Sequence, residues 1–102
     1  MRPPEKFSRV VNRKRYDVEK SQLIASDAFW DGHNFERHGR NTFLYKTARG
    51  NYFVVTLTCW QGEMDSLEPV SLDEAIEYYE NQLPEHAVSY QESFPSVEIQ
   101  EA

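Results

Sequence analysis

Lysine and arginine are missing from the second half of this 102-residue chain, because the last of its 11 basic side chains is Arg49. Residues 1–49 carry 11 basic and 6 acidic side chains, a net charge of +5. Residues 50–102 carry 11 acidic side chains and no basic one, so the overall charge of −6 hides two halves of opposite sign. Such an asymmetry is a clue to binding partners and not to the fold.

Cysteine and long apolar runs are also scarce. Cys59 is the single cysteine, so an internal disulfide is excluded and a reducing compartment is favoured. No apolar run approaches the roughly 18 residues needed to span a bilayer. No apolar stretch follows the basic first residues, which argues against a secretory signal. We therefore expect a cytoplasmic protein with no membrane partner.

The usual signatures of catalysis are absent as well. The chain has no G-x-G-x-x-G loop and no P-loop. Cys59 is expected beside Leu57 on the core face of a strand, where cysteine is normally inert. His33 and His38 lie close together with two carboxylates nearby, but their spacing matches no strong zinc signature. We predict no catalytic residue, cofactor or metal site, and keep a metal-dependent enzyme using the His33/His38 loop as the second alternative.

The aromatic and β-branched residues that are present predict an antiparallel sheet. Residues 42–47 and 52–60 are both rich in these types, and Gly50 between them can supply the positive φ of a tight hairpin. Shorter extended segments are expected at 23–26 and at 67–70, where Pro69 favours a sheet edge. The face expected to meet the core carries Phe53, Val55 and Leu57, with Leu44 contributing from the neighbouring strand.

One amphipathic helix is predicted after residue 70. Ser71 and Glu74 have the spacing of a capping box, and Pro84 ends the helix. A second capping-box pattern at Ser89 and Glu92 precedes a short helical turn. The apolar face of the main helix is expected to cover the sheet, and its residues are Leu72, Ile76, Tyr79 and Leu83.

These elements define an α+β fold class: a small antiparallel sheet of three to four strands with one main amphipathic helix packed on it. The length fits a single domain. We expect a flexible basic arm at residues 1–13, the domain at 14–95 and a frayed tail at 96–102.

The charge layout favours a non-enzymatic protein-interaction or accessory domain. An acidic helix face attracts a basic partner, and loops on rigid scaffolds often carry binding residues. The partner is a protein or a second copy, whose basic half would meet this acidic half. The candidate partner-binding residues are Trp30, His33, Phe35, Arg37 and His38 in the loop, and Asp73, Glu77 and Glu80 on the helix.

Nucleic-acid binding is the first alternative. Basic side chains neutralise phosphates, and the N-terminal segment carries six of them between Arg2 and Arg15. The acidic second half weighs against this alternative, since nucleic-acid-binding domains are usually basic overall. Its candidate residues are Arg9, Arg13, Lys14 and Arg15.

The pattern of these elements also resembles a known family. The segments that carry the resemblance are Tyr16-Asp17, Leu23-Ile24-Ala25, residues 43–47, Gly50, Tyr52-Phe53 and residues 68–75. They are similar to a family of small bacterial proteins found as accessory proteins of phages, plasmids and integrated elements. The resemblance implies no activity and transfers no functional residue. The basic segment before Lys14 and the loop from His33 to His38 depart from the family pattern.

Overall fold

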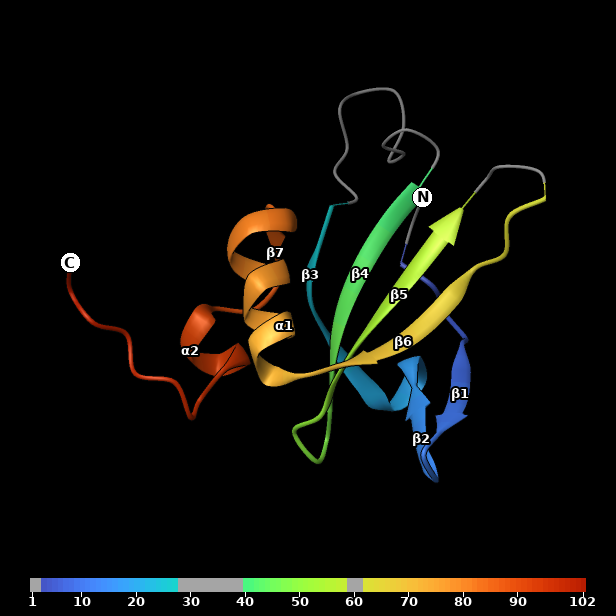
Figure 1. The fold of residues 1–102 in the computed structure, drawn as a ribbon, viewed down its shortest axis with the longest axis horizontal. Coiled ribbons are helices and arrows are strands. Elements are labelled where there is room, and N and C mark those ends of the chain that lie inside the picture. Colours follow the sequence, from blue (N-terminus) through green and yellow to red (C-terminus); the bar gives the residue numbers. More distant parts are fainter. Residues whose placement is uncertain (1–2, 28–39, 59–61) are drawn as a thin grey trace.

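The computed structural model describes residues 3–27, 40–58 and 62–102, and it shows an α+β fold (Figure 1). The main sheet has five antiparallel strands in the order β6-β5-β4-β3-β7, and a separate two-stranded sheet pairs β1 with β2. The strands are β1 (Ser8–Val11), β2 (Lys14–Asp17), β3 (Ser21–Ser26), β4 (Arg40–Thr47), β5 (Tyr52–Thr58), β6 (Ser66–Val70) and β7 (Glu85–His86). The helices are the 3₁₀-helix η1 (Val18–Lys20), α1 (Leu72–Glu77), its π-helical continuation η2 (Tyr78–Gln82) and α2 (Tyr90–Ser93).

The prediction of three to four strands was too low. The extra main-sheet strand is β7, whose two residues pair with Ala25 and Ser26 of β3. A two-residue strand is too short to show the alternation of apolar and polar residues that reveals a strand in a sequence. The β1–β2 pair was also not predicted as a sheet of its own.

The central hairpin of β4 and β5 is confirmed. Gly50 has φ +84° and its N–H donates to the carbonyl oxygen of Thr47 at 3.0 Å, so it provides the left-handed turn position. Pro69 lies in β6, which is an end strand of the sheet as its missing N–H requires.

Phe53 and Val55 are buried in the core as predicted, but the prediction that the helix covers their face of the sheet was wrong. The helix packs on the side of β5 that carries Tyr52 and Val54, together with Leu44 of β4. Phe53 and Val55 point to the opposite side, where Tyr16 and Val18 cover them, and the partly buried Leu57 packs there too. Both faces of β5 are apolar and both are buried, so alternation alone could not tell which one meets the helix.

The main helix begins with the predicted capping box, but one residue of its predicted apolar face is exposed. The capping box is present, because Ser71 N–H donates to Glu74 Oε1 at 3.0 Å and Glu74 N–H donates to Ser71 Oγ at 3.1 Å. Tyr79 and Leu83 are buried and Ile76 packs at the edge of the same cluster. Leu72 is 37% exposed, so its predicted place in the core was wrong. It occupies the first helical position, and Ala75, one turn on, takes the buried place instead.

The β1–β2 hairpin lies partly in the segment predicted as an arm. Ser8–Val11 pairs with Lys14–Asp17 through a two-residue turn, and Asn12 and Arg13 have φ of +53° and +67°. Val18 N–H donates to the carbonyl oxygen of Phe7 at 2.9 Å. The hairpin and η1 cover the Phe53 face of the sheet. Flexibility of residues 1–13 stays a prediction.

Candidate functional site: two surfaces of opposite charge

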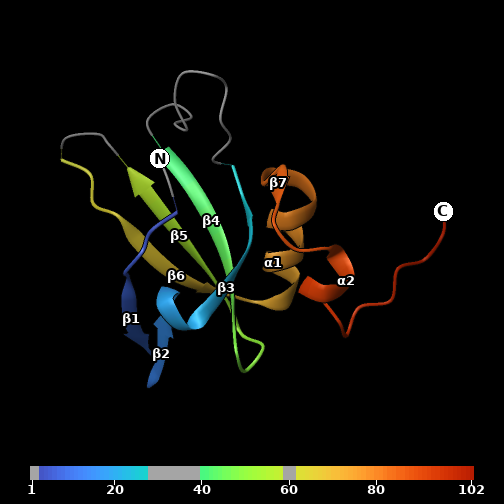
Figure 2. The same cartoon turned by 180° about the vertical axis from the view of Figure 1, so that it is seen from behind.

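The sheet separates two layers that differ in charge. Figures 1 and 2 show the β1–β2 hairpin on one side of the sheet and α1 with α2 on the other. Residues 6–20 contain six basic and two acidic side chains, whereas residues 71–102 contain eight acidic side chains and no lysine or arginine. The asymmetry along the sequence therefore becomes an asymmetry between the two faces of one sheet.

The acidic helix layer (residues 71–102) exposes its carboxylates. Asp73, Glu77 and Glu80 are all exposed on α1 and η2. Glu77 accepts a hydrogen bond from Asn81 Nδ2 at 2.8 Å, and Glu80 accepts one from the Tyr90 hydroxyl at 2.8 Å. That bond to Glu80 raises the pKa of Tyr90, because it favours the protonated hydroxyl. Within the described residues none of these three carboxylates forms an ion pair with lysine or arginine.

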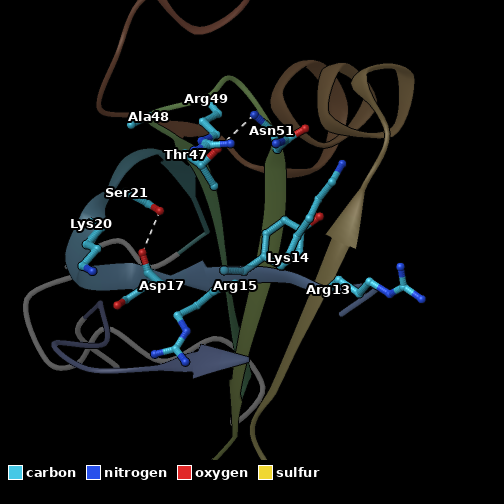
Figure 3. A pocket seen from close by; sticks show the side chains of 11 residues that line it. Arg13, Lys14, Arg15, Asp17, Lys20, Ser21, Thr47, Ala48, Arg49 and Asn51 are labelled. Atoms are coloured by element: carbon cyan, nitrogen blue, oxygen red, sulfur yellow. Dashed lines mark hydrogen bonds between the residues drawn. The ribbon is translucent and has the colours of Figure 1, made fainter. Parts of the chain in front are cut away.

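A hollow of about 700 Å³ lies between β2 and the β4–β5 turn. We call it the basic hollow; one bank is formed by residues 13–17 and 20–21 and the other by residues 47–49 and 51 (Figure 3). Five basic side chains and one acidic side chain line it, namely Arg13, Lys14, Arg15, Lys20, Arg49 and Asp17.

The cations of the basic hollow differ from Arg9, Arg40 and Lys46, which have partners within the described residues. Arg9 donates to Glu68 Oε1 and to the carbonyl oxygen of Leu67, each at 2.8 Å, and Arg40 pairs with Glu63. Lys46 donates to the carbonyl oxygen of Glu92 at 3.2 Å. In residues 3–27, 40–58 and 62–102, the five cations of the hollow form neither an ion pair nor a side-chain hydrogen bond. Their charge is thus available to a ligand.

The polar groups in the walls are largely used within the protein. Ser21 Oγ donates to the carbonyl oxygen of Asp17 at 2.7 Å, and Thr47 Oγ1 accepts from the Asn51 N–H at 3.0 Å. Asp17 Oδ1 accepts from the Glu19 N–H at 3.0 Å and so caps η1. These bonds fix both banks, and the cations are left as the groups that can bind a ligand.

Three of the four residues predicted to bind nucleic acid lie together in the structure, and the fourth lies apart. Arg13, Lys14 and Arg15 line the basic hollow, whereas Arg9 is held against β6 by Glu68. Lys20 and Arg49 also line it and were not among the predicted site residues. Their sequence positions give little signal, because Lys20 ends η1 directly before β3 and Arg49 lies in the turn between β4 and β5.

The predicted loop residues Trp30, His33, Phe35, Arg37 and His38 lie outside the described residues, as does Cys59. The described part of the chain holds no group of three or more histidine, cysteine, aspartate or glutamate side chains placed to bind a metal ion. His86 Nε2 lies 2.8 Å from the Tyr79 carbonyl oxygen, and its ring stacks on that of Tyr79 with centroids 3.8 Å apart.

Comparisons with protein-family models, with curated proteins and with solved structures found no match. The resemblance to accessory proteins of mobile elements therefore stays a prediction. Among the described residues, no helix is both long and apolar enough to span a bilayer.

Proposed function

We propose that this chain is a non-enzymatic protein-interaction domain that docks a basic protein surface on its acidic helix layer. The observation that supports it most is the charge of that layer: eight acidic side chains and no lysine or arginine in residues 71–102. A face that only needs to be solvated normally mixes charges of both signs. A face of one sign produces a field that speeds encounter with a partner of the opposite sign and repels other partners.

The helix layer is also held rigidly enough to present these charges. The capping box fixes the start of α1, while Tyr79 and Leu83 anchor η2 in the core. Tyr79 further donates from its hydroxyl to the carbonyl oxygen of Val88 at 2.7 Å. A partner therefore meets Asp73, Glu77 and Glu80 on a fixed scaffold, which lowers the entropy lost on binding.

The loop from Trp30 to Asn41 provides the second contact in this proposal, through Trp30, His33, Phe35, Arg37 and His38. Most of that loop lies outside the described residues. The partner belongs to the cytoplasm in this proposal. A second copy of the chain is one partner of suitable charge, because its basic hollow carries unpaired cations.

The proposal is tested by charge reversal on the helix. We expect a tagged Glu77→Lys/Glu80→Lys bait to lose the basic proteins that the wild-type chain captures from its source cells, measured by quantitative mass spectrometry. The matched control is Glu5→Lys/Glu19→Lys, which makes the same charge change at two exposed positions outside residues 71–102. The control bait should retain those partners.

Two results would contradict the proposal. One is an identical set of captured proteins for the wild-type and Glu77→Lys/Glu80→Lys baits, and the other is an equal loss with the control. A separate variant tests the non-enzymatic part: His33→Ala/His38→Ala/Cys59→Ala should keep the function of the chain in its cells. Loss of that function with retained folding would favour the metal-dependent alternative.

A further inference from the structure

The geometry points to a second binding site, in which the basic hollow holds the phosphodiester backbone of a nucleic acid. This inference concerns the opposite side of the sheet from the acidic helix layer, and it does not rest on the function proposed above. It is carried by two independent observations: the distribution of unpaired cations and the backbone conformation at Arg13.

Unpaired cations collect at the hollow. Nine lysine and arginine side chains lie in the described ranges, and six of them make neither an ion pair nor a side-chain hydrogen bond there. Five of those six line this one hollow, and the sixth is Lys6. The chain has enough carboxylates to pair them, as Glu68 and Glu63 pair Arg9 and Arg40. Like charges that line one hollow repel one another, and an anionic ligand would offset that repulsion.

The cations also occupy both banks. Arg13, Lys14 and Arg15 come from the tip of the β1–β2 hairpin, and Arg49 comes from the β4–β5 turn opposite (Figure 3). Lys14 extends toward the Arg49 bank and Arg15 points away from it (Figure 3), so a strand of phosphates in the hollow would meet Lys14 on one side and Arg49 on the other. Guanidinium groups suit phosphates because they can donate two parallel hydrogen bonds.

Arg13 occupies a strained turn position. It is the second central residue of a two-residue hairpin turn with φ +67°, where glycine is strongly preferred. Its left-handed backbone costs about 1–2 kcal/mol, whereas asparagine, which stands at position 12, tolerates that region better. Strained backbone positions such as that of Arg13 cluster at functional sites, where the side chain has a role that glycine could not fill. The function that fits an unpaired guanidinium at the rim of this hollow is anion binding.

A nucleic acid fits this shape better than a membrane or an acidic protein does. Lipid headgroups form a flat surface that touches a concave site only at its rim, whereas the phosphates of one strand follow a line. Duplex DNA carries one negative charge per about 1.7 Å, so it presents several phosphates to the five cations at once. The one aromatic residue in the lining, Tyr16, is only 7% exposed, so base stacking has no platform there. We therefore infer backbone contact without reading of sequence.

The test is fluorescence anisotropy with the full chain and labelled DNA of mixed sequence, as a duplex and as a single strand. We expect a Kd of roughly 10⁻⁴ to 10⁻⁶ M near physiological salt. The slope of log K against log salt should be no steeper than about −4.5 for the duplex, since each phosphate contact contributes about −0.9. The duplex and single-strand arms show which form supplies the backbone.

Matched variants locate the binding. Arg13→Gly places the preferred residue in the turn, so we expect the hairpin to be at least as stable while affinity falls roughly fivefold to tenfold. Adding Arg49→Ala from the other bank should make the slope shallower by about 2 in total. Lys6→Ala is the control, because it removes the same charge from an exposed residue outside the hollow. It should leave affinity within about twofold.

Four outcomes would overturn the inference. The first is no DNA binding by the wild-type chain at low salt, and the second is an equal loss with Lys6→Ala and Arg13→Gly. The third is binding to vesicles of phosphatidylserine and phosphatidylcholine with none to DNA. The fourth is self-association that Arg13→Gly abolishes, measured by light scattering without DNA, which would assign the hollow to an acidic surface of a second copy.

Discussion

Single residues in this protein show how burial changes chemistry. Tyr45 is 3% exposed and its ring stacks on Phe53, with centroids 5.2 Å apart. Burial raises the pKa of the Tyr45 hydroxyl to about 12, because the charged tyrosinate would lose its hydration. The same cause raises the pKa of Tyr52. The folded protein therefore resists loss of these protons at alkaline pH.

This shift predicts a loss of stability at high pH. The contribution of Tyr45 is complete below about pH 10, where the hydroxyl is protonated in both states. It declines as pH rises from about 10 to 12, because the unfolded chain releases the proton and the folded protein does not. Urea unfolding at about pH 8 and pH 11 should show a decline that is smaller for Tyr45→Phe than for wild type, by roughly 1–2 kcal/mol. Identical declines would contradict the burial of this hydroxyl.

At the scale of the element, the helix layer depends on its first turn. Ser71→Ala removes one half of the capping box and should lower the free energy of unfolding by about 1 kcal/mol. Ser96→Ala, at an exposed position after α2, should change it by less than about 0.5 kcal/mol. A loss at Ser71 no larger than that at Ser96 in chemical denaturation would show that the capping box does not stabilise α1.

In the main sheet, substitutions on either face should lower stability, because both faces are covered. Phe43 and Leu44 are neighbours in β4, both are 0% exposed, and they belong to the two separate core clusters. Phe43→Ala should cost about 3–5 kcal/mol and Leu44→Ala about 2–5 kcal/mol in urea unfolding. A sheet buried on one face only would tolerate one of the two substitutions, and that result would contradict the three-layer arrangement.

The elements also show what the sequence can predict. The hairpin at Gly50, the edge position of Pro69 and the capping box at Ser71 were predictable, because each depends on local backbone chemistry. The layer that covers the Phe53 face of the sheet was not predictable. Both faces of β5 are apolar, and the residues that cover this one lie about 40 positions earlier in the chain. β7 is too short to leave a pattern, and the basic hollow forms only when its two banks meet in the fold.

At the scale of the whole molecule, the fold places the basic and acidic parts of the sequence on opposite sides of the sheet. The basic hairpin packs on one face of the sheet and the acidic helices on the other, so the two binding sites that we propose lie on opposite sides (Figures 1 and 2). Net charge alone, at −6, argues against a nucleic-acid partner, but local charge decides binding when a sheet separates the two signs. We regard this separation as the central feature of the protein.

The most direct test of the separation compares two double variants in the DNA salt titration. Arg13→Gly/Arg49→Ala changes the net charge by two units on the basic side, and Glu77→Lys/Glu80→Lys changes it by four units on the acidic side. Two independently acting surfaces predict that the first variant loses roughly tenfold or more in DNA affinity with a shallower salt slope, while the second keeps the wild-type slope. Affinities and slopes that follow net charge alone, with Glu77→Lys/Glu80→Lys gaining contacts and a steeper slope, would contradict the account.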